Sequence, residues 1–448
     1  MDIIICGGGE IGSEAAEVLA RRGDNVTVID TDAKRLSYLE EHLDIRTLNG
    51  VASSAQSLRA AGAAQADAVI AVTGIDEVNL VCATVAASLG AGRTLARVDH
   101  SLYLGHESMD YATLFSVDRL FSPDRATARA MAARLANPAA LAVSRVARGT
   151  VEIQAFPVDA KGSATGKKLR DISMPKASRA VAVCRDGKWR LPTADTRFKI
   201  GDRVTVVVDV DHFDDLDGVF TAHHSRQLRI AVFGGSAASV WLCRALKNRG
   251  SIIHLFEADS ERSNELAEKL DWVTVINADL TAPSIFEDQG LDKMDAFLAM
   301  GDDDENMLGS AIARKAGIPM ILTMTHRGQL EPLLEQLGVT KAFNPWTSAM
   351  EDIIHFISNS AFETVGTLGE EQSDLELVRI RIGNKSPLAG QTLRHIKPDM
   401  NLIVAVVEDE SEQGHVPVAD DVLTAGRHIL VACEKGQEKQ LRKLFDAR

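Results

Sequence analysis

The feature that most constrains the fold of this chain is an internal duplication whose period is about half the chain length. The sequence opens with M-D-I-I-I-C-G-G-G-E-I-G, and L-R-I-A-V-F-G-G-S-A-A-S repeats this pattern 227 residues later, so that Gly234 matches Gly7. Asp30 and Glu257, which each end a β-rich segment, have the same separation. Solenoid repeats are only roughly 20 to 50 residues long. A period this long therefore predicts tandem copies of a whole domain arrangement.

Each copy divides into two parts with different patterns. The first part, about 120 residues long, alternates short β-rich segments with helical ones. This alternation is typical of βαβ units in a doubly wound parallel sheet. The second part, about 70 residues long, contains short strands, turn residues and one short helix. We call the two parts the N-lobe and the C-lobe.

The predicted fold class is therefore α/β, with two tandem units that each contain a Rossmann-like N-lobe and a small α+β C-lobe. The segments that connect the lobes carry apolar residues at helical spacing. Such a helix could pack on its own domain or cross over to a partner domain, and the sequence leaves both possibilities open. The expected segments are 1–122 (first N-lobe), 123–148 (crossover helix), 149–222 (first C-lobe), 227–345 (second N-lobe), 346–366 (crossover helix) and 374–448 (second C-lobe).

The first copy carries a G-x-G-x-x-G motif between a predicted strand and a predicted helix. Gly7 allows a tight turn out of the strand, Gly9 lets a pyrophosphate approach the backbone, and Gly12 lets the helix lie close to the sheet. The N-terminus of the helix would then offer its N–H groups to a phosphate. The alternative is a glycine turn that serves packing alone.

Asp30 follows the glycine motif at the end of the second predicted strand. A carboxylate at this place accepts hydrogen bonds from ribose hydroxyls and disfavours a 2′-phosphate. The sequence therefore favours NAD(H) or another adenine nucleotide over NADP(H).

The second copy retains Gly234 but has serine at the other two glycine positions. Ser236 adds a side chain where the phosphate would lie, and Ser239 adds bulk where the helix meets the sheet. Glu257 could still bind a ribose, and serine hydroxyls can bind a phosphate. We expect an empty or altered site in the second N-lobe.

Composition excludes several classes of function. The net charge of −14 argues against a nucleic-acid partner, which requires a basic surface. No apolar segment approaches the ~20 residues of a spanning helix, so we expect no direct membrane span. The five cysteines are scattered and form no C-x-x-C pair, which is typical of the reduced cytosol and predicts neither a metal site nor a disulfide framework.

The sequence offers no constellation of catalytic residues. Most of the 12 histidines are isolated, and none has the spacing of a triad or a zinc site. We expect no catalytic residue and no enzymatic activity. A soluble NAD-dependent oxidoreductase remains the alternative, because the partners of a general base need only be near in space.

Several motifs together resemble the TrkA family, the regulatory subunits of Trk potassium-uptake systems. They are I-I-I-C-G-G-G-E-I-G, V-I-D-T-D, A-V-T-G-I-D-E-V-N, L-A-R-V, and the G-x-x-L-R-x-I pattern that both C-lobes share. The resemblance covers essentially the whole chain. It implies two tandem RCK units, each a Rossmann-like N-lobe with a small C-lobe.

The resemblance also implies a function. It predicts a peripheral cytoplasmic protein at the inner face of the cell membrane that binds NAD(H) or ATP/ADP and gates a Trk-type membrane potassium-channel subunit. It further implies a homo-oligomer, a tetramer that forms a ring of eight RCK units. A regulator of another cation transporter is the alternative.

The resemblance assigns residues to a nucleotide site in the first N-lobe. The family commonly has a second arginine two residues after Arg97, where this chain has Asp99, and Met324 stands at the place of Arg97 in the second copy. The implied site comprises Gly7, Gly9, Glu10, Ile11, Gly12, Asp30, Thr31, Thr73, Asp76, Asn79 and Arg97. A possible second site comprises Gly234, Ser236 and Glu257.

Overall fold

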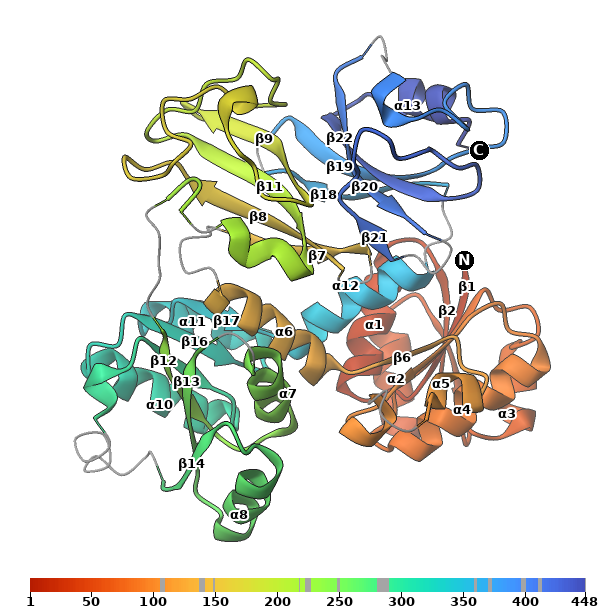
Figure 1. Cartoon of the computed structure of the whole chain (residues 1–448). Coiled ribbons are helices and arrows are strands. Elements are labelled where there is room, and N and C mark those ends of the chain that lie inside the picture. Colours follow the sequence, from red (N-terminus) through yellow and green to blue (C-terminus); the bar gives the residue numbers. More distant parts are fainter. Residues whose placement is uncertain are drawn as a thin grey trace. The chain divides into compact units, whose positions relative to one another are not determined.

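The computed structural model describes most of the chain (Figure 1). The residues it leaves undescribed are 105–108, 137–141, 148–149, 217, 222–226, 248–249, 280–289, 358–360, 370–372, 396–399, 410–412 and 448. The domain boundaries that we expect at 148–149 and at 222 lie outside the described residues, as does the last residue of the second G-x-x-L-R-x-I motif.

The chain forms two compact units, and each unit takes corresponding parts from both copies. The first unit contains Met1–Ala132 and Gln227–Ile357, and the second contains Ala133–Arg226 and Ser358–Arg448. The repeat runs N-lobe, C-lobe, N-lobe, C-lobe along the sequence. The compact units instead group the two N-lobes together and the two C-lobes together.

The first N-lobe is a doubly wound parallel sheet with strand order β3-β2-β1-β4-β5-β6. Its strands are β1 (Asp2–Cys6), β2 (Asn25–Asp30), β3 (Arg46–Asn49), β4 (Ala68–Ala71), β5 (Thr94–Arg97) and β6 (Arg119–Phe121). Its α-helices are α1 (Glu10–Arg21), α2 (Ala33–His42), α3 (Ala55–Ala61), α4 (Asp76–Leu89) and α5 (Tyr111–Leu114). Since the strands are parallel, their carboxyl ends share one edge of the sheet, where ligands of such folds bind.

The second N-lobe has the same order, β14-β13-β12-β15-β16-β17. Its strands are β12 (Arg229–Phe233), β13 (Ile252–Glu257), β14 (Thr274–Asn277), β15 (Ala296–Ala299), β16 (Met320–Met324) and β17 (Lys341–Phe343). Its described α-helices are α7 (Ala237–Leu246), α8 (Ser260–Lys269), α10 (Asp303–Lys315) and α11 (Glu331–Gln336).

The sheet of the first N-lobe is buried on both faces, which explains its uninterrupted apolar strands. Ile3 and Ile5 of β1 pack with α1 and α2 on one face. Ile4 and Cys6 pack with α3 and α4 on the other. A parallel sheet between two helical layers is thus a direct consequence of strands without a polar side.

The helix α12 (Pro345–Ile357) follows the second N-lobe in sequence but packs into the core of the first. Its buried residues Met350 and Ile353 share one apolar cluster with Ala15 and Leu19 of α1. Figure 1 shows α12 beside α1. This helix therefore crosses from the second copy to the first.

The equivalent helix α6 (Pro123–Ala136) contacts the second N-lobe. The guanidinium of Arg125 lies 4.9 Å from the ring centroid of Trp241 on α7. Each crossover helix therefore contacts the N-lobe of the other copy.

The C-lobes are antiparallel sheets that share a core, in which Val181 and Val207 of the first lobe pack with Leu377 and Leu430 of the second. The first has order β10-β9-β11-β8-β7, and the second has order β18-β19-β22-β20-β21. Their strands are β7 (Ala142–Val146), β8 (Val151–Pro157), β9 (Ser178–Arg185), β10 (Lys188–Arg190) and β11 (Arg203–Asp209), then β18 (Phe362–Thr367), β19 (Leu375–Arg381), β20 (Leu402–Glu408), β21 (Gly414–His415) and β22 (His428–Glu434).

The predicted fold class is confirmed: two Rossmann-like parallel sheets, each with a small C-lobe. One detail differs, because the only α-helix in the described part of the C-lobes is α13 (Glu438–Phe445). At the corresponding place in the first C-lobe, the chain forms the 3-10 helix Val210–Leu216. None of the helices in the described part of the chain has the length and apolar composition of a membrane span.

Candidate functional site

The glycine turn after β1 uses its three glycines in two different ways. Gly7 has a φ of +112°, a conformation that L side chains rarely adopt. A Cβ atom on Gly12 would lie 1.8 Å from the carbonyl oxygen of Gly7. A Cβ atom on Gly9 would meet no atom within 4 Å. The turn itself therefore requires Gly7 and Gly12, whereas the absence of a side chain at Gly9 leaves open space.

Gly9 is the N-cap residue of α1 and makes no side-chain capping bond. Helices are usually capped by a serine, threonine, aspartate or asparagine that accepts from the first free N–H groups. Without such a side chain, the amides of the first turn of α1 face open space together with the positive end of the helix dipole. This is the arrangement that binds phosphates in nucleotide sites.

Asp30 joins the turn to the end of β2. Its Oδ2 accepts from the amide of Gly8 at 2.6 Å, and its Oδ1 accepts from the amide of Asp32 at 2.8 Å. Since each carboxylate oxygen can accept two hydrogen bonds, Asp30 retains capacity for ribose hydroxyls. Asp32 in turn caps α2 by accepting from Lys34 N at 2.9 Å.

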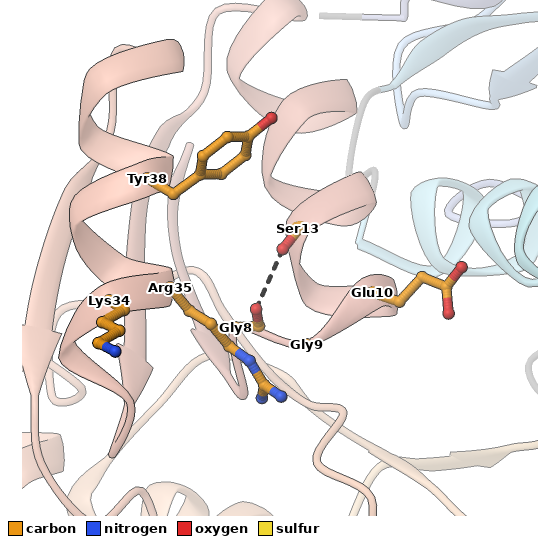
Figure 2. Close-up of a pocket in the computed structure, with 7 residues that line it drawn as sticks. All are labelled: Gly8, Gly9, Glu10, Ser13, Lys34, Arg35 and Tyr38. Carbon is orange, nitrogen blue, oxygen red and sulfur yellow. Dashed lines mark hydrogen bonds between the residues drawn. The ribbon is translucent and has the colours of Figure 1, made fainter.

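A pocket of about 390 Å³ opens beside the turn, between the first turns of α1 and α2 (Figure 2). It is lined by Gly8, Gly9, Glu10, Ser13, Lys34, Arg35 and Tyr38. Arg35 extends from α2 toward the glycine turn, and Lys34 also lines the pocket (Figure 2). Tyr38 is 61% exposed, which is high for an aromatic residue. An anion with an attached planar group fits this combination of charge and aromatic surface.

The residues expected from the sequence did not include five that line this pocket: Gly8, Ser13, Lys34, Arg35 and Tyr38. A signal was present, because Lys34 and Tyr38 are four residues apart and such residues share one face of a helix. The helix that carries this face, α2, begins shortly after Asp30 and is capped by Asp32. The first turns of the helix after Asp30 therefore offer side chains to the same pocket as the glycine turn.

The other expected residues occupy different positions around the turn. The side chain of Ile11 is buried in the apolar core, so that only its backbone can meet a ligand. The carbonyl of Thr31 accepts from Asn49 Nδ2 at 3.1 Å in the loop after β2.

Asn79 and Asp76 form hydrogen bonds with the backbone at the carboxyl ends of β4 and β5. Asn79 is 0% exposed, and its amide group bonds to the backbone of Thr73 and to the carbonyl of Arg97. Asp76 accepts from the amides of Asp99 and His100 at 2.9 Å each. These two side chains hold the ends of β4 and β5 in place and are occupied by those contacts.

Arg97, which we expected to meet distal phosphates, is already paired within the protein. Its Nε and Nη2 donate to the two carboxylate oxygens of Asp99 at 2.9 and 2.5 Å. Its guanidinium also lies 5.2 Å from the ring centroid of Trp346. Burial raises the pKa of Asp99, and although Arg97 opposes this, Asp124 and Asp76 raise it further. The family's arginine is therefore present, but a carboxylate holds it.

The second N-lobe preserves the frame of the turn. Gly234 has a φ of +88°. Glu257 accepts from the amides of Gly235 and Asp259 at 2.7 and 2.8 Å, as Asp30 does in the first copy. The geometry that joins the first and second strands is thus the same in both N-lobes.

In the second turn, side chains of the protein form hydrogen bonds with backbone groups that would otherwise face a ligand. Ser236 is the N-cap of α7 and accepts from Ser239 N at 3.2 Å, while Ser239 Oγ donates to Gly234 O at 2.5 Å. Arg262, the counterpart of Arg35, donates to the carbonyl of Gly235 at 3.0 and 2.9 Å. Side chains of the protein therefore provide hydrogen-bond partners for the backbone of this turn.

Two Rossmann-like sheets, each paired with a small antiparallel C-lobe, define a class of proteins that are built from duplicated units of this kind. The family described as TrkA-N domain matches residues 3–123 and 230–345, and TrkA-C domain matches residues 377–446. The chain belongs to the TrkA family, as its motifs predicted.

Relatives and solved structures agree with this membership. "Trk system potassium uptake protein TrkA" of Halomonas elongata is 28% identical, covering 99% of this chain and 98% of its own. "Trk system potassium uptake protein TrkA homolog 1" of Methanosarcina mazei is 26% identical, covering 99% and 100%. The structure "GsuK channel bound to NAD" matches with a TM-score of 0.61 and 15% identity, covering 100% of this chain and 79% of its own. "Crystal Structure of the GsuK RCK domain" matches with a TM-score of 0.59 and 17% identity, covering 100% and 95%. These structures support the RCK-type fold.

Proposed function

We propose that this chain is the regulatory subunit of a potassium-uptake system and that it binds one adenine nucleotide in its first N-lobe. The observation that carries the proposal is the uncapped N-terminus of α1 beside the open space at Gly9. Membership of the TrkA family and the names of its potassium-uptake relatives support the regulatory role.

In this proposal the pyrophosphate of the ligand lies on the first turn of α1, against Gly9. Asp30 accepts from the ribose hydroxyls of the adenosine, and Lys34 and Arg35 supply positive charge from α2. Gly7 and Gly12 shape the turn without touching the ligand. Thr73, at the end of β4, faces the ligand where it passes toward β5.

We assign no ligand to the second N-lobe. A phosphate there would have to displace the capping bond of Ser236 and the two bonds from Arg262 to the carbonyl of Gly235. The second copy instead supplies α12 to the core of the first N-lobe. One copy would sense the nucleotide and the other would complete the structure that responds.

The proposed role is regulation and not catalysis. The subunit would sit at the cytoplasmic face of the membrane as a homo-oligomeric ring of RCK units and gate a Trk-type potassium-channel subunit. A nucleotide can shift such an assembly only through its different affinities for two conformations, with a coupling of about 1–3 kcal/mol per site.

Calorimetric titration of the purified protein with NAD, NADH, ATP and ADP tests the nucleotide site. We expect one site per chain and recovery of the ligand unchanged. Two sites per chain would contradict the assignment of the second N-lobe. Turnover of the ligand would contradict the regulatory role, and the absence of all binding would remove the nucleotide from the proposal.

A matched pair of variants separates binding from folding. Aspartate is a good N-cap residue, so Gly9→Asp should cap α1 and leave the melting temperature unchanged or higher while its charge repels the phosphate. We expect at least a hundredfold loss of affinity, or about 2.7 kcal/mol. Ser236→Asp makes the equivalent change in the second copy and should leave binding and stability unchanged. Loss of assembly in Gly9→Asp would mean that the turn is structural.

Potassium flux tests the regulatory part of the proposal. Proteoliposomes that contain a Trk-type channel subunit should show rubidium flux that depends on both this protein and nucleotide. Addition of the Gly9→Asp variant should remove the nucleotide dependence. Flux that is indifferent to this protein would exclude the proposed partner.

A further inference from the structure

The far end of the nucleotide site, at the carboxyl end of β5, contains a cluster of carboxylates around one arginine. Asp99 binds the guanidinium of Arg97 through both of its oxygens. Asp76 and Asp124 are near enough to act on the charge of Asp99. Asp124 comes from the first turn of α6, so the cluster joins the β5 edge to a crossover helix. The charge of Arg97 is thus more than offset by its neighbours.

This cluster lies where the distal part of a bound nucleotide must arrive. The sheet order places β5 two strands from β1. At about 4.8 Å per strand, Arg97 lies about 10 Å from the glycine turn. A ligand with its adenosine at Asp30 and its pyrophosphate on α1 would extend its remaining group over β4 toward Arg97. In NAD that group is the nicotinamide ribose, and in ATP it is the terminal phosphate.

Trp346 adds a second observation at the same place. Its indole ring lies on the guanidinium of Arg97, 5.2 Å from ring centroid to guanidinium carbon, and it is more than nine-tenths buried. Arg97 is therefore held both by the carboxylate of Asp99 and by a buried ring of α12, which keeps its guanidinium at this edge of the sheet.

We propose that Asp99 is a specificity-determining residue that makes the site select a ligand with an uncharged or cationic distal group, NAD, against ATP. Asp99 occupies the place on Arg97 that a terminal phosphate would need, and its charge repels that phosphate. The oxidised nicotinamide ring is cationic, so the negative charge of Asp99 attracts it. This inference rests on the proposed nucleotide site in the first N-lobe.

Calorimetric titration of full-length Asp99→Asn with NAD and with ATP tests the inference. The wild-type protein should bind NAD more tightly than ATP. Removing one like charge near the terminal phosphate should raise ATP affinity about tenfold. NAD affinity should change less than about threefold, so that the NAD/ATP ratio falls.

Two control variants isolate the charge at this position. Asp99→Glu keeps the carboxylate and should retain the wild-type preference for NAD. Asp44→Asn makes the same change in net charge at the amino edge of the sheet, just before β3, and should also leave the ratio unchanged. If Asp99→Asn is unstable, Asp124→Asn removes a neighbouring carboxylate that is not bonded to Arg97 and should raise ATP affinity about threefold.

The outcomes distinguish this inference from the function on which it rests. An unchanged NAD/ATP ratio in Asp99→Asn, or a ratio that falls equally in Asp44→Asn, would overturn the role of Asp99 while leaving the nucleotide site intact. A wild-type protein that prefers ATP would also overturn it. Absence of binding by every nucleotide to the wild-type protein would instead refute the site itself.

Discussion

At the scale of single residues, the two copies differ in the N-cap residue of the helix that follows the first strand. Gly9 makes no side-chain capping bond to the first amides of α1, whereas the hydroxyl of Ser236 accepts from an amide of α7. Asp99 similarly provides the anion that Arg97 would otherwise take from a ligand. An open turn and a closed turn can therefore share one backbone conformation and differ in a few polar side chains.

The different roles of the motif glycines predict different costs of substitution. Gly12→Ala should destabilise the protein by about 3 kcal/mol, because the new Cβ would overlap the Gly7 carbonyl oxygen and overpacking outweighs the gain in helix propensity. Gly9→Ala should cost less than about 0.5 kcal/mol, because its φ of −69° is ordinary and the space is open. Urea unfolding of both variants checks this, and equal losses would contradict the assignment.

The roles of these residues were predictable to different degrees. The glycine motif and Asp30 are recognisable in sequence because their roles depend on a turn formed by neighbouring residues. The pairing of Arg97 with Asp99 involves residues two apart at the end of a strand, but its stacking on Trp346 joins residues from different copies. No local sequence pattern predicts a contact between residues so distant in the chain.

At the scale of secondary-structure elements, the crossover helices determine how the copies combine. The apolar face of α12 lies in the core of the first N-lobe, where Ile353 is 1% exposed. The sequence showed that the helix had an apolar face but not which domain would cover it. A helix of the second copy therefore contributes to the stability of the lobe that carries the proposed site.

Truncation of this face should destabilise the first N-lobe. Ile353→Ala should reduce its free energy of unfolding by about 2–4 kcal/mol, since it removes buried methyl groups and leaves a cavity. Thr347→Ala, on the exposed face of α12, should cost less than about 0.5 kcal/mol. Hydrogen exchange should show the loss of protection in β1 and α1. A loss confined to the second N-lobe would contradict the observed packing.

At the scale of the whole molecule, the two halves are complementary and not interchangeable. When α6 and α12 are aligned on their first residues, Pro123 and Pro345, Asp124 stands where α12 has Trp346. Along the same alignment α6 has Ala128 where α12 has Met350, Met131 where it has Ile353, and Arg134 where it has Phe356. α6 therefore lacks counterparts of Trp346, Met350 and Phe356, which α12 places in the core of the first N-lobe.

This complementarity predicts that the first half will not fold well alone. Residues 1–226 lack both α12 and the second C-lobe, which supply parts of two apolar cores. We expect this fragment to aggregate or bind a hydrophobic dye, and co-expression with residues 227–448 should yield a one-to-one complex by size-exclusion chromatography. A monomeric fragment that unfolds with wild-type stability would show that the halves are independent.

The duplication, the parallel sheets and the glycine turns follow from the sequence alone, because they depend on periodicity and on backbone conformations within a few residues. Three features could be known only from the folded chain: which lobe each crossover helix contacts, which side chains close the second turn, and how Arg97 is neutralised. Those outcomes depend on charge and shape between residues distant in sequence, such as Arg97 and Trp346. The same repeat could otherwise have paired each helix with its own lobe.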